Sequence, residues 1–139
     1  MNDIQILKLK SQGYCCSQIM VLMVLDLLDK ENEDLVHFAR GLCMGGGTEN
    51  GACGILAAGM CILAMYAQTD TEKLALMQEA YLIFFQTQAQ SGILCKDILG
   101  DHYPVPRSET CGALLSQSHA QLMAILLENG FDPSDLSGN

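Results

Sequence analysis

Arg40-Gly-Leu-Cys-Met-Gly-Gly-Gly-Thr-Glu-Asn-Gly-Ala-Cys-Gly-Ile-Leu-Ala-Ala-Gly-Met-Cys61 is the stretch of sequence that decides the fold. It contains three consecutive glycines, Gly45 to Gly47, and continues into an apolar segment that has no charged residue between Asn50 and Thr69. Because glycine has no Cβ, such a loop can bend tightly and approach another group closely. The following segment is too rich in leucine, alanine, methionine and isoleucine for a surface helix. It therefore predicts a buried central helix over residues 51–67.

Cys53 lies at the beginning of this predicted helix. If Asn50 is the N-cap residue, Cys53 occupies the third helical position. There, backbone N–H groups without helical partners and the helix dipole favour a thiolate. The position predicts thiol chemistry or metal binding at this end of the helix.

Composition and charge limit the possible functions of the chain. Its 139 residues correspond to one domain, half of them are hydrophobic, and the net charge is -9. The few Lys and Arg residues form no basic patch, which argues against nucleic acid and anionic membrane surfaces as partners. The longest apolar run is shorter than a membrane span, and the first residues lack the pattern of a secretory signal. We therefore expect a cytoplasmic protein with one domain over residues 1–139, of which 131–139 form a loose tail.

Helical periodicity and capping residues predict most of the secondary structure. Before the central helix, we expect a short helix that ends near Gly13, one from Cys15 or Cys16 to Asp29, and one over 33–43. After it, we expect a helix of about twenty residues that is capped within 69–72 and ends by Gly92. A turn of helix over 95–99, closed by Gly100, precedes a last helix that Ser108 caps and that runs to about Glu128.

No segment shows the alternating pattern of a β-strand, and Pro104 and Pro106 predict irregular backbone over 101–107. The predicted fold is all-α, a compact bundle of five or six helices.

Four of the seven cysteines share a position in this scheme. Each falls in or next to the first turn of a predicted helix, where the pKa of a thiol is lowered and the thiolate becomes available to metals or disulfides. These four are Cys16, Cys53, Cys95 and Cys111. No Cys-x-x-Cys occurs, so a shared site must be assembled by folding.

The other three cysteines carry weaker signals. Cys43 and Cys61 lie on apolar helix faces, where cysteine is usually a small packing residue. Cys15 adjoins Cys16 and could replace it. His119 lies eight residues after Cys111 on roughly the same helix face, so it could reach the site. We interpret it as more typical of a local hydrogen-bonding residue.

The sequence resembles a family of redox-active proteins named for four cysteines and a Cys-Gly-Ala-x-x-Gly motif. The resemblance covers essentially the whole chain. It rests on Cys16 within Cys15-Cys-Ser-Gln18, on Gly45 to Gly47 before Cys53-Gly54, on Cys95 within Cys95-Lys-Asp-Ile-Leu-Gly100, and on Cys111. It implies a small helical protein with a redox or metal-linked role in which these four cysteines work. Ile55 and Ala58 stand where the motif has alanine and glycine.

Three functions follow as hypotheses. The first is electron transfer by an Fe–S cluster, or alternatively zinc binding, with Cys16, Cys53, Cys95 and Cys111 as ligands. The second is thiol–disulfide exchange without a metal, with an unidentified redox partner protein. The third is a helical interaction module, for which we expect a homodimer, and whose cysteines only pack. Gly45, Gly46 and Gly47 are candidates for binding a cofactor phosphate, although the Lys-Ser/Thr of a P-loop is missing.

Overall fold

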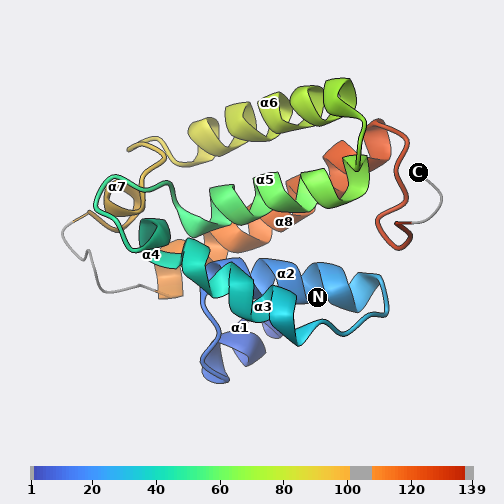
Figure 1. Ribbon diagram of the computed structural model, residues 1–139. Helices are drawn as coiled ribbons and strands as arrows, with labels where there is room; N and C mark the ends of the chain where they lie inside the picture. The colour runs from blue at the N-terminus through green and yellow to red at the C-terminus, as the bar shows by residue number, and fades with distance from the viewer. Residues whose placement is uncertain (1, 101–107, 137–139) are drawn as a thin grey trace.

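The computed structural model describes residues 2–100 and 108–136, and the described part is built from helices (Figure 1). No strand occurs within these ranges, so the predicted all-α bundle is confirmed. The predicted irregular segment 101–107 lies outside the described residues. The helices are α1 (Asn2–Ser11), α2 (Cys16–Leu27), α3 (Glu33–Ala39), the 3₁₀ turn η1 (Arg40–Leu42), α4 (Cys43–Gly46), α5 (Gly54–Ala67), α6 (Thr71–Gln88), α7 (Cys95–Leu99) and α8 (Ser108–Glu128).

Helix α5 is the centre of the bundle, as its uncharged sequence predicts. It packs against α2, α6 and α8, and Figure 1 shows it enclosed among them. Burial of large apolar side chains on all these helices is the main stabilising term of the fold. The largest of the fully buried side chains include Tyr66, Tyr81, Phe85, Ile19, Met20, Ile55 and Leu63.

Several helix ends lie where the sequence places them. The side chain of Asp70 accepts a hydrogen bond of 3.0 Å from the backbone N–H of Lys73 and so caps α6. Helix α7 ends at Leu99, and Gly100 follows with a positive φ of 56°, which glycine adopts without a steric penalty. Local capping chemistry therefore specifies these two boundaries.

The beginning of α5 differs from the prediction. Cys53 is the N-cap residue, with extended backbone angles, and the first helical residue is Gly54. Residues 51–53 cannot join the helix because their backbone pairs with another segment, described below. Asn50 is therefore not the cap, and Cys53 is not at the third helical position. The helix predicted over 33–43 likewise ends earlier, at Ala39, before the tighter turn η1.

The three glycines form part of a left-handed turn that runs from within α4 to Gly47, the residue after it. Met44, Gly45, Gly46 and Gly47 all have positive φ, between 56° and 80°. Gly45 approaches the backbone of Gly51 so closely that a Cβ on Gly45 would lie 2.9 Å from the Gly51 carbonyl oxygen. A Cβ on Gly51 would overlap the Gly45 carbonyl group. Two segments of bare main chain cross here, which only glycine permits.

Residues 131–136 contact the bundle, although the sequence predicts a loose tail after Phe131. Phe131 is buried, and the hydroxyl group of Tyr66 donates a hydrogen bond of 2.6 Å to the Pro133 carbonyl oxygen. The side-chain amide of Gln68 donates to the Leu136 carbonyl at 3.0 Å. These contacts hold the described part of the tail against α5.

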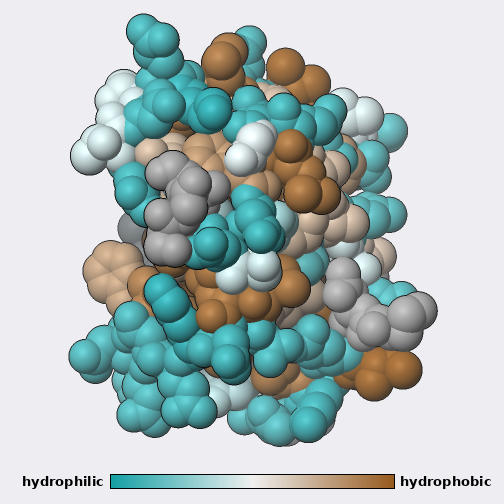
Figure 2. Space-filling model, turned by 90° about the vertical axis from the view of Figure 1, so that its right-hand side faces the viewer, coloured by the Kyte–Doolittle hydropathy of each residue, from teal (hydrophilic) through white to brown (hydrophobic). Residues whose placement is uncertain are grey.

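The surface mixes polar and apolar residues, and Figure 2 shows separate hydrophobic patches between hydrophilic ones on one face. In the described part of the chain, no helix is long and apolar enough to cross a membrane. The homodimer expected from the sequence stays a prediction, which sedimentation at micromolar concentration would test. Among the side chains that the structure describes, the exposed large hydrophobic ones are Ile4, Leu7, Leu27, Phe38, Leu76, Ile83 and Leu127.

Candidate functional site

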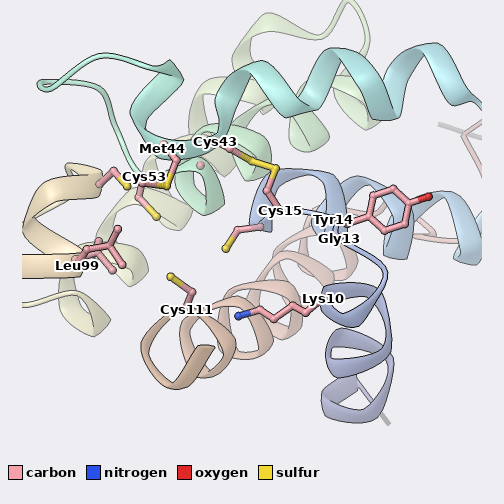
Figure 3. Close-up of a pocket in the computed structure, with 13 residues that line it drawn as sticks. Lys10, Gly13, Tyr14, Cys15, Cys43, Met44, Cys53, Leu99 and Cys111 are labelled. Carbon is pink, nitrogen blue, oxygen red and sulfur yellow. A yellow bond between two sulfur atoms is a disulfide. The ribbon is translucent and has the colours of Figure 1, made fainter. Parts of the chain in front are cut away.

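A cavity of about 330 Å³ lies at one end of the bundle, where α4 and α7 meet the first residues of α2, α5 and α8 (Figures 1 and 3). Its wall is mainly apolar, and Lys10 is the one charged side chain among the described residues that line it. Six cysteines line this cavity: Cys15, Cys16, Cys43, Cys53, Cys95 and Cys111. Folding therefore brings the four predicted cysteines together, along with two that the sequence analysis did not select.

Cys53 and Cys95 are positioned by a short piece of antiparallel pairing between two loops. An isolated bridge joins Ala52 to Leu94. On either side of it, the backbone N–H of Cys53 donates to the Ile93 carbonyl at 2.8 Å, and that of Cys95 donates to the Gly51 carbonyl at 3.2 Å. These bonds satisfy the backbone groups of residues 51–53 outside a helix. They fix the starts of α5 and α7 beside each other at the cavity.

Gly54, directly after Cys53, has a packing role. A Cβ at this position would lie 3.0 Å from the Leu42 carbonyl oxygen and 3.4 Å from the Cα of Cys43. The absence of a side chain therefore allows the backbone around Cys43 to approach the first residue of α5. Gly54 thus allows Cys43 to lie close to the start of α5, so that Cys43 and Cys53 both line the cavity.

Cys16 and Cys111 form a pair of thiols across the cavity. Their side chains are hydrogen-bonded to each other, although they come from the first turns of α2 and α8. Cys111 is buried in a small apolar cluster with Cys95 and Leu99, and Cys16 packs against this cluster. Two thiols that share a hydrogen bond lie side by side, as a disulfide between them requires.

A disulfide joins Cys15 to Cys43, with 6.4 Å between the two Cα atoms (Figure 3). The interpretation of Cys43 as a packing residue is therefore wrong. Sequence spacing gives no signal for this pairing, because the two residues are 28 positions apart and meet only when η1 and α4 fold back onto α2. The bond ties the residue that precedes α2 to the first residue of α4.

Ser17 and Gln18, which follow the cysteine pair, hold the start of α2 against the end of α3. The buried hydroxyl group of Ser17 donates to the Ala39 carbonyl at 2.6 Å. The side-chain amide of Gln18 donates to the Val36 carbonyl at 3.1 Å, and its oxygen accepts from the backbone N–H of Cys15 at 3.2 Å. These buried polar groups are thus satisfied, and they fix the positions of Cys15 and Cys16.

The thiols of the cavity do not have the lowered pKa values that the sequence analysis expects. Burial raises the pKa of Cys53 to about 11, although hydrogen bonds from the backbone of Ile55 and Leu56 act in the opposite direction. The hydrogen bond to Cys111 raises the pKa of Cys16, and burial raises it further. Burial and the neighbouring Cys111 also raise the pKa of Cys95. Desolvation, the hydrogen bond to Cys111 and the neighbouring ionisable cysteines therefore outweigh the effect of the helix N-termini on these pKa values.

Lys10 acts against the rise in the pKa of Cys16. Its positive charge lowers the pKa of the Cys16 thiol, though by less than the hydrogen bond and burial raise it. In Figure 3 the amine of Lys10 extends into the space beside Cys111. A cation at this place would stabilise a thiolate once a proton leaves.

The donors of the cavity have the chemistry of a metal site but not the arrangement of one. Thiolates are the ligands that Fe–S clusters and structural zinc prefer. Among the described side chains, however, no three Cys, His, Asp or Glu residues converge at a point that could hold a metal ion.

Other candidates from the sequence lie elsewhere. Gly45, Gly46 and Gly47 are not among the residues that line the cavity. The backbone of Gly45 packs against Gly51, and that of Gly46 lies near the Gly41 carbonyl. Cys61 is exposed on α5, so its interpretation as a packing residue is wrong. His119 is buried on α8, where desolvation lowers its pKa, and it does not line the cavity.

The residues that follow Cys53 and Gly54 pack within the core. Ile55 and Ala58 are fully buried. The close helix contact occurs one residue later, at Gly59, where a Cβ would overlap the ring of Tyr81. Gly59 therefore leaves room for the Tyr81 ring between α5 and α6.

Comparison with known proteins agrees with this arrangement of cysteines. Neither the comparison with curated proteins nor that with solved structures finds a match. A family model described as "Putative redox-active protein (C_GCAxxG_C_C)" matches residues 14–125, which include every cysteine of the cavity. The chain therefore belongs to this family of cysteine-containing, redox-active proteins.

Proposed function

We propose that this protein transfers electron pairs by thiol–disulfide exchange and that Cys16 and Cys111 are its working pair. The observation that carries the proposal is the hydrogen bond between these two thiols in a cavity at the end of the bundle. Membership of a family described as redox-active supports it. The reducing cytoplasm, where we expect the protein, would keep the pair as thiols between turnovers.

The reaction consumes a disulfide of a partner protein or small molecule, R–S–S–R′. Cys16, which is only half-buried, loses its proton to the solvent, and its thiolate attacks one sulfur atom of the partner. This step forms the mixed disulfide Cys16–S–S–R and releases R′–S⁻, which takes up a proton. Cys111 then loses its proton, attacks the sulfur of Cys16, and releases R–SH. The pair loses two electrons and two protons, and the partner gains them.

The surroundings of the pair fit these two roles. Cys111 is almost fully buried, so an external disulfide reaches Cys16 first. Lys10 supplies the positive charge that favours the Cys16 thiolate. Because the pKa of Cys16 is raised in the resting protein, little of it is thiolate, and exchange becomes faster when a disulfide in the cavity displaces the hydrogen bond between the thiols.

The test is a titration of the purified, reduced protein with oxidised glutathione, followed by differential alkylation and peptide mapping. The expected product is a Cys16–Cys111 disulfide that dithiothreitol reverses. In the Cys111→Ser variant, a stable mixed disulfide with glutathione should accumulate at Cys16, because nothing resolves it. The matched control is Cys61→Ser, which removes an exposed thiol of α5 outside the cavity and should behave like the unsubstituted protein.

An outcome in which Cys16 and Cys111 stay reduced at every glutathione ratio, while Cys61 reacts, would refute this function. A disulfide that links Cys16 to another cavity cysteine would refute the assignment of Cys111.

A second candidate function uses the same cavity as a metal centre. The presence of four thiols, Cys16, Cys53, Cys95 and Cys111, in one cavity favours it. These residues would be the ligands of an Fe–S cluster or of zinc, and a cluster, when bound, supplies one-electron transfer. Anaerobic purification with counts of iron, zinc, sulfide and thiols on one sample separates the two functions. Stoichiometric metal that is lost in the Cys→Ser variants would favour the metal centre over thiol–disulfide exchange.

A further inference from the structure

The Cys15–Cys43 disulfide lies on the wall of the cavity, and the function proposed above does not use it. Both of its residues are only partly buried, in contrast to Cys53, Cys95 and Cys111. Figure 3 shows the bond between the labelled Cys15 and Cys43. A thiol compound that enters the cavity can therefore contact this disulfide as well as the buried thiols of Cys53, Cys95 and Cys111.

The hydroxyl group of Ser17 lies against this disulfide. Ser17 is fully buried, and its oxygen is 2.7 Å from the sulfur of Cys43 and 3.6 Å from that of Cys15. A serine hydroxyl has one proton, and here the Ala39 carbonyl takes it at 2.6 Å. The oxygen thus faces the sulfur of Cys43 with its lone pairs.

The two redox states of Cys43 differ in what they offer to that oxygen. A disulfide sulfur has no proton, so in the oxidised state two electron-rich atoms stand in contact with no hydrogen between them. A Cys43 thiol carries a proton that it can donate to Ser17. Reduction would then complete a chain in which Cys43 donates to Ser17 and Ser17 donates to Ala39. The reduced state gains a hydrogen bond that the oxidised state lacks.

We propose that Cys15 and Cys43 form a second redox couple on the wall of the cavity, and that Ser17 is a positioning residue that favours its reduced form. The reductant is a thiol, either a small one such as glutathione or a cysteine of a partner protein. Two thiols, 2 R–SH, give two electrons and two protons to Cys15–S–S–Cys43, which yields the Cys15 and Cys43 thiols and R–S–S–R. This couple does not rest on the Cys16–Cys111 pair.

The test measures the fraction of reduced Cys15 and Cys43 in glutathione buffers of increasing reducing power, under nitrogen, by isotopic alkylation and mass spectrometry. Both cysteines should become reduced together, as one two-electron couple, at millimolar reduced glutathione. A disulfide that stays oxidised throughout this range would overturn the proposal, because it would then be a structural cross-link.

The Ser17→Ala variant tests the role of the hydroxyl group. A hydrogen bond of ordinary net strength corresponds to about a fivefold change in the equilibrium constant. The exchange equilibrium should shift by this factor toward the disulfide, equivalent to about 20 mV for a two-electron couple. In this variant the Ala39 carbonyl lacks its hydrogen bond from residue 17 in both redox states. That loss therefore affects the disulfide and the thiols equally and does not change the equilibrium between them.

Two further variants make the result specific. Ser11→Ala also removes a hydroxyl group that donates to a carbonyl at 2.6 Å, but this group is exposed and its acceptor is the Lys8 carbonyl. This variant should leave the equilibrium between the Cys15–Cys43 disulfide and its thiols unchanged. Ser17→Thr keeps a hydroxyl group and should retain most of the effect. Equal equilibria for Ser17→Ala and the unsubstituted protein would overturn the role of Ser17. The titration of the unsubstituted protein tests the couple even where Ser17→Ala fails to fold.

The two redox proposals can fail separately, because alkylation reports each cysteine. Oxidation of Cys16 with Cys111 and no reduction of Cys15 with Cys43 would support the function proposed above and overturn the second couple. The reverse pattern would do the opposite.

Discussion

The hydroxyl group of Tyr81 donates a hydrogen bond of 2.8 Å to the carbonyl oxygen of Ile55. The tyrosine belongs to α6 and the carbonyl to the first turn of α5, only two residues after Cys53. The ring reaches this carbonyl across Gly59, whose missing side chain leaves room for it. This contact anchors the end of α5 that carries the cavity, and it makes Gly59 a position where packing and site geometry depend on the same small residue.

Gly59→Ala should therefore destabilise the protein by about 1 to 3 kcal/mol, since the added methyl group overlaps the Tyr81 ring in a packed core. The matched control is Gly112→Ala on α8, where the nearest atom to the new Cβ is the Lys10 Nζ at 3.9 Å. That change should stabilise the helix by roughly 0.5 to 1 kcal/mol. Urea denaturation followed by circular dichroism measures both. Equal midpoints for the two variants would contradict the close contact.

Breaking the Cys15–Cys43 disulfide should lower the free energy of unfolding. A link across 28 residues restricts the unfolded chain, and the loop-entropy relation gives roughly 3 to 4 kcal/mol for its loss. Urea denaturation of the Cys15→Ala/Cys43→Ala double variant measures the change. Cys61→Ala, which removes an exposed thiol that is in no disulfide, should leave the midpoint close to that of the unsubstituted protein. A double variant with an unchanged midpoint would show that the two residues are not linked in solution.

Cys53 should react with iodoacetamide much more slowly than an ordinary thiol. Burial raises its pKa from 9.0 to about 11, so at neutral pH its thiolate population is about a hundredfold smaller. Because Cys53 is also buried whereas Cys61 is exposed, Cys61 should be alkylated first. Peptide mapping after timed alkylation gives both rates. Faster labelling at Cys53 than at Cys61 would contradict the raised pKa. It would instead support the thiolate that the sequence predicts for Cys53 at the start of α5.

Tyr66 should make the protein less stable in alkaline solution. Burial raises its pKa from 10.0 to about 12, and the negative charge of Asp132 adds to this. Between these values the folded protein keeps a proton that the unfolded chain has lost. The stabilisation is thus complete below pH 10 and disappears as the pH rises toward 12. The free energy of unfolding, measured by urea denaturation across this range, should fall with pH. Tyr66→Phe should reduce the slope, and an unchanged slope would contradict the shift.

The sequence predicts the helical framework well because local chemistry specifies it. Asp70 caps α6 through its own side chain, and Gly100 ends α7 through its left-handed backbone. The start of α5 is predicted wrongly because the backbone of Cys53 pairs with Ile93, forty residues later in the chain. No local signal for that pairing exists in the sequence.

The sequence predicts only part of the candidate site, because the helix starts are local features whereas the disulfide and the thiol pKa values depend on contacts between distant residues. Helix starts correctly mark Cys16, Cys53, Cys95 and Cys111 as cysteines that line one cavity. The Cys15–Cys43 disulfide depends on the folding of η1 and α4 against α2, and spacing alone cannot reveal it. The state of the thiols is predicted wrongly because helix N-termini are a local effect, whereas burial and hydrogen bonding to Cys111 arise only when the helices assemble.

The crossing of Gly45 and Gly51 has a consequence for how this chain can evolve. A side chain on either residue meets the main chain of the other, and main chain is present whatever amino acid stands there. No compensating substitution at the partner position can therefore rescue the first one, so the two sites cannot drift together as paired core residues do. Lineages of this protein should retain both glycines while α5 exchanges one apolar residue for another, which makes the crossing a fixed point in an otherwise variable core.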